Sequence, residues 1–319
     1  MLRWTDLTQI PEGFGPSVVT LGNFDGVHRG HRAVLATVLE QARERGAQAV
    51  AVTFDPHPVA VLRPDQAPRT ITPLGLRLDL LEGTGLDAVL VQEFTAELAG
   101  WTPERYVEEV FVEALGATAV VVGEDTRFGV RNSGDVSTLR ALGEKHGFDV
   151  VVLKDLGGDT RWSSSQVREL VATGDVAAAA EILGRPHRIT GTVVHGDHRG
   201  RELGYPTANL SQEMGGLVPA DGVYAGWLLR LDLPGEDADR VLPAAVSIGT
   251  NPTFDGHQRR VEAYALDRTD LDLYGEQVGV ELVERLRPTE RFGSVEELLE
   301  QMARDVDRCR EVLTSIVPS

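Results

Sequence analysis

Apolar runs that alternate with helical segments are the feature that most constrains the first half of this chain of 319 residues. Runs rich in valine and alanine occupy residues 17–22, 49–54, 87–92, 117–123 and 149–153, and segments with helical spacing lie between them, at residues 30–45, 74–82, 102–115 and 133–146. A strand that is apolar along its whole length is buried on both faces, so this order predicts a parallel sheet with helices on both sides. Such a doubly wound, Rossmann-like α/β domain binds its ligands at the carboxyl ends of its strands.

The pattern changes in the second half. Two short helical segments, at residues 164–172 and 175–183, end at Gly184-Arg185-Pro186, which is typical of a helix stop and a linker. The β-like runs beyond it have no helical pattern between them, and they occupy residues 189–195, 222–230, 241–248, 261–266 and 278–284. Closely spaced strands with Gly/Pro turns predict a small antiparallel β-barrel, and a capping box at residues 294–297 predicts a closing helix. We therefore expect two domains, residues 1–184 and 185–319.

The charge and the cysteine count narrow the classes of function. The formal net charge is −18, whereas a protein that binds a nucleic acid duplex usually presents a basic face, so we expect no nucleic acid partner. The sequence has no apolar run long enough to span a membrane and no apolar N-terminal segment, so we expect no membrane association and no signal peptide. The single cysteine, Cys309, fits a reducing compartment. We expect a cytoplasmic protein that is a monomer or a weak homo-oligomer.

The first chemical motif follows the first apolar strand and opens the first helix. It reads LGNFDGVHRGH, residues 21–31. Glycines at such a turn let backbone N–H groups approach phosphate oxygens, and a helix N-terminus favours an anion. The spacing of His28 and His31 puts two imidazoles at the same end of the helix, where they can hold the charge that builds on a transferring group. An HxGH motif at this turn predicts nucleotidyl transfer.

The second chemical motif lies just beyond the linker, at residues 191–209. Its glycines and basic residues can form a loop over the phosphates of ATP. Thr207 and Asn209 are two residues apart, and on an extended segment such residues face the same way. Their two oxygens could therefore reach one Mg²⁺, a hard cation that prefers oxygen ligands and also binds phosphates.

The two motifs resemble those of one bacterial family, the bifunctional riboflavin kinase/FMN adenylyltransferases or FAD synthetases. The segment GNFDGVHRGH, with residues 53–58, 123–129 and 161–168, is similar to the adenylyltransferase module, and residues 191–209 are similar to the riboflavin kinase signature. Residues 247–254, 261–263, 271–275 and 286–287 match further kinase blocks, so the resemblance covers nearly the whole chain. It implies that ATP and Mg²⁺ serve two sites, which convert riboflavin to FMN and then FMN to FAD with release of pyrophosphate.

The resemblance also implies the residues of both sites. The catalytic residues are Glu262, which would accept a proton in the kinase, and His28 and His31 in the adenylyltransferase. The adenylyltransferase would bind ATP phosphates with Gly22, Asn23, Phe24, Asp25, Gly26, His28, His31, Ser164, Ser165 and Arg168, and would form its flavin or nucleotide pocket with His57, Asp125 and Arg161. The kinase would bind ATP with Gly191, His195, Gly196, Arg199, Gly200, Gly204 and Thr207, and would hold its metal with Thr207 and Asn209.

Alternative interpretations stay open at this point. Thr126 stands where the family usually carries an aromatic residue and Trp162 where it carries an aliphatic one, so the chain could be a riboflavin kinase with an impaired adenylyltransferase domain. A non-catalytic flavin carrier is a second alternative. For single residues, Glu262 could be a surface partner of Arg259 or Arg260, and His57 could cap a turn between two prolines.

Overall fold

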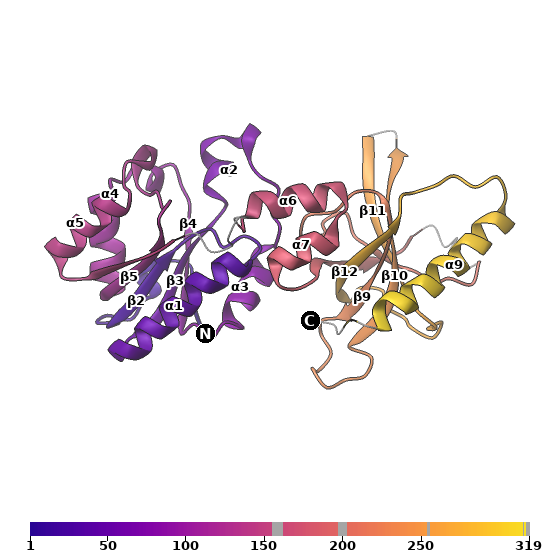
Figure 1. Cartoon of the computed structure of the whole chain (residues 1–319), viewed down its shortest axis with the longest axis horizontal. Coiled ribbons are helices and arrows are strands. Elements are labelled where there is room, and N and C mark those ends of the chain that lie inside the picture. The colour runs from indigo at the N-terminus through magenta and orange to yellow at the C-terminus, as the bar shows by residue number, and fades with distance from the viewer. Residues whose placement is uncertain (155–161, 197–202, 254–255, 315, 317–319) are drawn as a thin grey trace. The chain divides into compact units, whose positions relative to one another are not determined.

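The chain folds into two compact units, which are described here one at a time. A computed structural model describes residues 1–154, 162–196, 203–253, 256–314 and 316, without the side chains of residues 251–253 and 256–258 (Figure 1). The first unit comprises Met1–Pro68 and Leu74–Ser163, and the second comprises Arg69–Pro73 and Ser164–Ser319. Among the described residues, no helix combines the length and the apolar character that a membrane span requires.

The first unit is built on a six-stranded parallel sheet with the order β1-β4-β3-β2-β5-β6. Its strands are β1 (Leu2–Trp4), β2 (Ser17–Leu21), β3 (Gln48–Asp55), β4 (Ala88–Glu93), β5 (Ala117–Gly123) and β6 (Asp149–Leu153). The order reverses at β2, because the chain adds β3 and β4 on one side of that strand and β5 and β6 on the other. Ligands bind beside such a reversal, at the carboxyl ends of the strands on either side of it.

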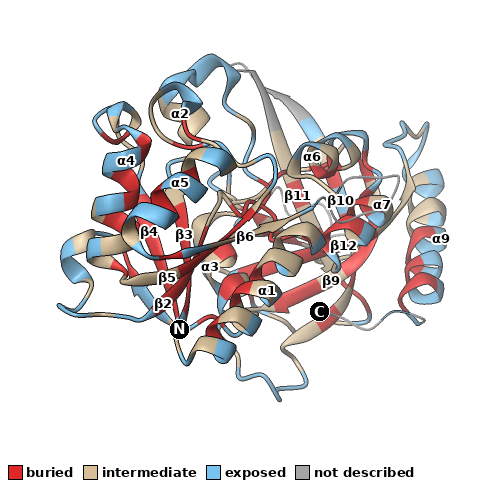
Figure 2. Ribbon diagram, turned by 60° about the vertical axis from the view of Figure 1, so that its left-hand side comes forward, coloured by how far each residue is buried: buried red, intermediate tan, exposed pale blue. Residues whose placement is uncertain are grey.

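Helices cover both faces of this sheet. They are α1 (Arg29–Arg45), α2 (Pro58–Leu62), α3 (Leu74–Glu82), α4 (Pro103–Tyr106) and α5 (Val136–His146), with a π-helix η4 (Val107–Ala114) and the 3-10 turns η1 (Leu7–Gln9), η2 (Pro64–Gln66), η3 (Leu98–Gly100) and η5 (Val130–Asn132). Val19, Val50 and Val120 pack on one face against Phe111 and Leu139. Their neighbours Val18, Ala51 and Val121 pack on the other face against Leu35 and Leu81. Figure 2 shows the central strands buried. The predicted doubly wound α/β domain is confirmed.

The second unit contains a closed antiparallel barrel with the order β10-β11-β8-β7-β12-β9. Its strands are β7 (His187–Val194), β8 (Ala208–Leu210), β9 (Gly222–Arg230), β10 (Val241–Thr253), β11 (Gly256–Ala265) and β12 (Gln277–Arg287), and its helices are α6 (Ser164–Thr173), α7 (Val176–Leu183) and α9 (Val295–Thr314). Strand residues alternate between the interior and the outside, as Val261 and Ala263 do on either side of Glu262. The predicted barrel and its closing helix are confirmed.

Helix α9 packs on the outside of the barrel and buries Cys309. The thiol lies in an apolar cluster with Ala225, Val283, Val306 and Leu313. Burial raises the pKa of Cys309 to about 12, so the thiol stays protonated at neutral pH. A protonated, buried thiol is a structural group.

Helices α6 and α7 belong to the barrel unit. Val176 is buried in the core cluster of the barrel, and Ile182 and Leu183 are buried on the same helix. Arg285 of β12 also donates a hydrogen bond to the carbonyl of Thr173, at 3.3 Å. The compact units therefore divide at residue 163, which is earlier than the predicted domain boundary at residue 184. That boundary stays a prediction about the two activities.

A segment from the first half of the sequence completes the second unit. Ile71 is fully buried. A Cβ atom added to Gly216 would lie 3.4 Å from the carbonyl oxygen of Ile71, so the two backbone segments are close together. Arg168 of α6 donates to the carbonyl of Arg69 at 2.8 Å. Residues 69–73 therefore supply part of the packing of a unit whose remainder begins at residue 164.

We predict that a fragment of residues 164–319 is more stable than a fragment of residues 185–319. Only the shorter fragment lacks Val176, Ile182 and Leu183, and burial of each such side chain contributes roughly 1.5–3 kcal/mol. The midpoint of thermal unfolding, followed by circular dichroism, should be lower by roughly 10 °C or more for the shorter fragment. Both fragments lack residues 69–73, so their difference reports α6 and α7 alone. Equal midpoints would show that these helices do not stabilise the barrel.

Candidate active sites

The loop after β2 forms the first candidate site. It leaves the sheet at the reversal of strand order, and residues 22–28 connect β2 to α1. Three of these residues adopt a left-handed backbone, with φ of 49° at Phe24, 88° at Gly26 and 40° at Val27. Phe24 and Val27 are buried, so packing holds two side chains in a conformation that L-residues rarely adopt. Backbone strain of this kind is concentrated at binding and catalytic sites.

His28 and His31 lie face to face at the start of α1. Their ring centroids are 3.7 Å apart and the ring planes differ by 20°. His28 is the N-cap of α1, and its Nδ1 accepts a hydrogen bond from the backbone N–H of His31 at 3.3 Å. A Cβ at Gly30 would lie 3.1 Å from the His28 ring, so the glycine of the HxGH motif gives this ring its room. The sequence prediction that both imidazoles share one end of a helix is correct.

Burial sets the charge of the second ring of the pair. Burial, and then the proximity of His28, lower the pKa of His31 well below its usual value, so His31 is neutral at pH 7 in the free protein. Nδ1 of His31 is buried and has no hydrogen-bond partner among the described residues. A phosphate beside the pair would offer that partner, and its negative charge would favour the protonated form of His31.

His57 reaches this loop from the end of β3. Its Nδ1 accepts from the N–H of Val59 at 3.2 Å, so His57 caps α2, and its Nε2 lies 3.2 Å from the side-chain amide of Asn23. The capping interpretation of His57 is therefore correct, and the same ring also contacts the candidate site. Its direct contact with a ligand stays a prediction.

Arg77 is a residue of this site that sequence reasoning missed. It lies in α3, and its guanidinium donates to the backbone carbonyl of Asn23 at 2.8 Å. The segment LGLRLDLLE has helical spacing, and an arginine in such a helix usually faces solvent, yet Arg77 is only 4% exposed. No local pattern distinguishes a buried arginine from a solvated one.

The remaining adenylyltransferase residues lie in several places. Gly22 and Asp25 belong to the loop after β2, where Asp25 is buried, and Asp125 follows β5 and is exposed.

Trp162 packs near the start of α1, with the guanidinium of Arg29 5.9 Å from its ring centroid. Ser164, Ser165 and Arg168 open α6 and belong to the second unit, and Arg161 lies outside the described residues. The assignment of any of the predicted site residues to a ligand stays a prediction.

Thr207 and Asn209 form the centre of the second candidate site. Nδ2 of Asn209 lies 3.2 Å from Oγ1 of Thr207, so the two side chains are in contact on one side of the chain, as their spacing predicts. Asn209 of β8 stands directly opposite Glu262 of β11 in the antiparallel register. Opposite residues place their Cβ atoms about 4.5–5.5 Å apart on the same face. The strand pairing therefore brings the predicted proton acceptor beside the predicted metal ligands.

The strand pattern also decides how Glu262 is exposed. Its neighbours Val261 and Ala263 point into the barrel, so Glu262 points outward, beside Asn209. Arg259, one of the two arginines considered above as a surface partner of Glu262, forms an ion pair with Asp221 at 2.9 Å. A carboxylate with access to solvent and beside two oxygen-bearing side chains suits proton transfer from a bound hydroxyl group.

Gly196 and His195 border these residues. A Cβ at Gly196 would lie 2.6 Å from the side-chain atoms of Asn209, so any larger residue there would push that amide aside. The ring of His195 packs on the ring of Tyr274 with centroids 3.9 Å apart. Gly191 is buried inside strand β7 and Gly204 has a left-handed φ of 85°, whereas Arg199 and Gly200 lie outside the described residues.

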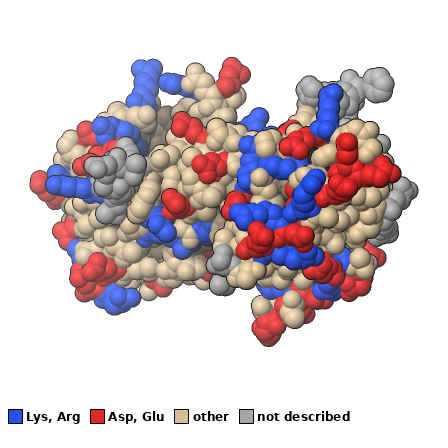
Figure 3. All heavy atoms as spheres, turned by 45° about the vertical axis from the view of Figure 1, so that its right-hand side comes forward, with Lys and Arg blue, Asp and Glu red and all other residues tan. Residues whose placement is uncertain are grey.

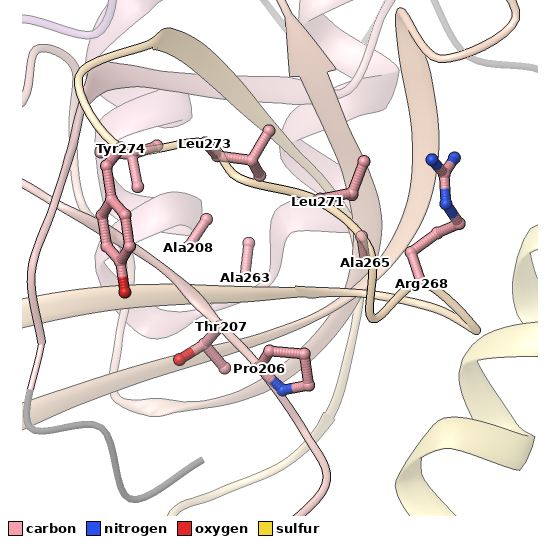
Figure 4. Close-up of a pocket in the computed structure, with 10 residues that line it drawn as sticks. Pro206, Thr207, Ala208, Ala263, Ala265, Arg268, Leu271, Leu273 and Tyr274 are labelled. Carbon is pink, nitrogen blue, oxygen red and sulfur yellow. The ribbon is translucent and has the colours of Figure 1, made fainter. Parts of the chain in front are cut away.

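A small pocket opens at this end of the barrel. Figure 4 shows Thr207, Ala208, Ala263 and Tyr274 around it, with the phenol of Tyr274 on the same side as the hydroxyl of Thr207. Its volume is about 40 Å³, which holds a few water molecules and is too small for a flavin ring. Tyr274, which lines the pocket and packs on His195, was not predicted as a site residue although it lies in a matching block.

Two family models match the chain, one in each half. The model for FAD synthetase matches residues 11–167 and the model for riboflavin kinase matches residues 183–313. A bifunctional riboflavin kinase/FMN adenylyltransferase from Escherichia coli strain K12 is 38% identical over 308 residues, 96% of this chain and 95% of that protein. The protein of the same name from Bacillus subtilis strain 168 is 33% identical and covers 93% of this chain and 92% of its own length. This chain belongs to the bifunctional riboflavin kinase/FMN adenylyltransferase family.

The two sites divide between the two family models. The HxGH pair, Asn23 and His57 fall within the FAD synthetase match, and Thr207, Asn209 and Glu262 fall within the riboflavin kinase match. The chain is therefore a transferase with an adenylyltransferase half followed by a kinase half. A crystal structure described as a macrolide-efflux protein from Streptococcus pneumoniae shares the fold, with a TM-score of 0.84, 29% identity, and coverage of 97% of this chain and 98% of that one.

We predict that Gly196→Ala impairs the kinase half selectively. The new methyl group would displace the Asn209 amide from Thr207, and disturbing a group that orients a metal ligand commonly costs roughly 10- to 100-fold in metal affinity or activity. The rate of FMN formation should be measured against Mg²⁺ concentration. Gly235→Ala is the matched control, because a Cβ there would meet nothing within 4 Å. An unchanged Mg²⁺ dependence in Gly196→Ala would contradict the assignment of Asn209.

Proposed function

We propose that this chain makes FAD in two steps on two separate sites. The barrel unit transfers the γ-phosphoryl group of ATP to riboflavin, and the α/β unit then transfers the adenylyl group of a second ATP to FMN. The placement of Glu262 directly opposite Asn209 carries the kinase assignment. Riboflavin, ATP, FMN and FAD are the ligands that this function requires. The single, buried cysteine supports a reducing, cytoplasmic setting.

In the kinase step, the riboflavin 5′-hydroxyl oxygen attacks the γ-phosphorus. The bond from that phosphorus to the bridging oxygen breaks, ADP leaves, and Glu262 accepts the hydroxyl proton. Phosphoryl transfer of this kind needs positioning and charge stabilisation more than covalent chemistry from the protein. The step needs one proton acceptor. We assign this role to Glu262, because its carboxylate lies on the same face of the sheet as Asn209, the proposed metal ligand.

The oxygen atoms of Thr207 and Asn209 fit Mg²⁺. Both are hard donors. The two side chains meet through the amide nitrogen of Asn209, which donates to Oγ1 of Thr207 at 3.2 Å, so a half-turn of the amide would bring its oxygen to the same place. Two protein ligands leave the other positions around the ion to phosphate oxygens and water, as is usual for Mg²⁺. When bound, Mg²⁺ neutralises charge on the ATP phosphates and helps to orient them.

In the adenylyl transfer step, a phosphate oxygen of FMN attacks the α-phosphorus of ATP and pyrophosphate leaves. No covalent enzyme intermediate is needed, because FMN already carries the nucleophile. His28 and His31 stabilise the charge on the transferring group, and the loop at residues 22–28 offers backbone N–H groups at a helix N-terminus. We assign Ser164, Ser165 and Arg168 to the phosphates that leave as pyrophosphate.

One assay separates this function from the two alternatives. The purified chain is given riboflavin, ATP and Mg²⁺, and the products are separated by chromatography. FMN and FAD together support the bifunctional enzyme. FMN alone would support a kinase with an impaired adenylyltransferase domain, which Thr126 and Trp162 suggest. Absence of both products would leave a flavin carrier.

We predict that the double variant His28→Ala/His31→Ala loses FAD synthesis and keeps FMN synthesis. Each positioned group that stabilises a transition state commonly contributes roughly a hundredfold or more. The rate of FAD formation from supplied FMN should therefore fall by at least that factor. FMN formation from riboflavin is the internal control, because its residues lie in the other unit. A rate of FAD formation near that of the unaltered chain would contradict the role of the pair.

We predict that Glu262→Gln lowers the kinase kcat by roughly 10²- to 10⁴-fold, the usual contribution of a general base. The amide keeps the shape of the side chain and removes the basic oxygen, so KM for ATP should change little. Steady-state kinetics of FMN formation measure both constants, and circular dichroism checks folding. If Glu262 were only a surface ion-pair partner, the variant would show near-normal kcat and a stability change of about 1 kcal/mol or less.

A further inference from the structure

A buried arginine in the first unit joins the ends of two strands beneath the candidate site. Arg77 donates to the backbone carbonyl of Asn23 at 2.8 Å, to that of Phe54 at 3.3 Å, and to Oδ1 of Asp55 at 3.2 Å. Asn23 lies just beyond β2, and Phe54 and Asp55 end β3. One planar guanidinium therefore fixes the carboxyl ends of two adjacent strands, where a doubly wound sheet binds its ligand.

Burying this cation is costly, so its position needs compensation. Taking a charge out of water costs several kcal/mol unless hydrogen bonds and opposite charges replace the solvent. Burial lowers the pKa of Arg77, and the carboxylates of Asp25 and Asp55 counteract that effect. An apolar side chain would fill the same volume without this cost, but it could not donate to the carbonyls of Asn23 and Phe54.

The hydrogen bond to Asn23 acts on the part of the loop that carries the chemistry. The same carbonyl also accepts from Oγ1 of Thr53 at 3.1 Å, so two donors fix the Asn23 peptide. The next residue, Phe24, has the left-handed φ of 49°, and its ring contacts His31 with centroids 5.2 Å apart. The Asn23 side chain meets His57. Arg77 thus holds the Asn23 peptide, which carries the side chain that meets His57 and precedes the Phe24 ring that contacts His31.

We propose that Arg77 is a positioning residue for adenylyl transfer. It acts through the Asn23 peptide on His31 and His57, and it touches neither substrate. The inference rests on the proposed function of the α/β unit. The three acceptors around Arg77 need a planar group with several donors. A lysine, which presents one compact ammonium, is therefore a poor substitute at this position.

Three variants test this role in the full chain. Arg77→Lys keeps the charge, Arg77→Met keeps much of the volume, and Arg77→Ala leaves space for a free guanidinium ion. The matched control is Arg3→Met, because Arg3 ties the exposed face of the same helix through Asp79 and Glu82. The measurements are kcat/KM for FAD formation from FMN, the midpoint of thermal unfolding, and the rate of FMN formation from riboflavin.

Arg77→Lys and Arg77→Met should lower kcat/KM for FAD formation by roughly 10- to 100-fold, the cost of a misplacement of about 1 Å at a reacting centre. FMN formation should not change, and Arg3→Met should leave both activities unchanged. Millimolar guanidinium, far below the concentrations that unfold proteins, should raise the rate of FAD formation by Arg77→Ala and not that of the unaltered chain. A purely structural arginine would show no such rescue once the protein is folded.

The outcomes separate the inference from the proposed function. An unaltered chain that makes no FAD would refute the proposed function of the α/β unit, and this inference with it. An active unaltered chain together with a folded, fully active Arg77→Lys would overturn the inference alone. Failure of guanidinium to rescue a folded Arg77→Ala, or loss of the folded α/β unit in every Arg77 variant, would assign Arg77 to stability and also overturn it.

Discussion

The pairing of β2 on both of its edges is the constraint on which the first unit depends. β2 is hydrogen-bonded to β3 on one side and to β5 on the other, and its core residues are fully buried. The chain continues to β3 on one side of β2, and β5 is added on the other side, so the order of the strands reverses at β2. The loop after β2 emerges at this reversal, where the connections leave a crevice open for a ligand. The HxGH pair, the Asn23 peptide and the end of β3 are all placed by this one position in the sheet.

Each site also depends on a glycine that leaves room for a neighbouring polar side chain. In the first unit Gly30 lies against the ring of His28, and in the second Gly196 lies against the amide of Asn209. The His28 ring and the Asn209 amide therefore each pack directly against the backbone of a glycine. Figure 3 shows a face on which basic and acidic residues are interspersed. Exposed ion pairs such as that of Arg310 with Asp267 involve none of the site residues.

The elements that the sequence predicts correctly are those set by local pattern. The valine runs predict the strands, the His28–His31 spacing predicts a shared helix end, and the Thr207–Asn209 spacing predicts contact on one side of a strand. The missed features depend on partners far along the chain. The edge strand β1 is three residues long with one buried side chain, and the burial of Arg77 depends on carbonyls 23 and 54 residues away in sequence. The register that sets Asn209 against Glu262 likewise depends on closure of the barrel.

The packing of residues 69–73 in the barrel unit has a consequence for synthesis on the ribosome. This segment is translated early, but the residues that bury Ile71, including Gly216, are translated much later. At about 5–20 residues per second, the delay is roughly 7–30 s. During that interval the first unit can fold, but Ile71 has no partners from the second half of the chain to pack against, so the second unit cannot be completed before that half is translated.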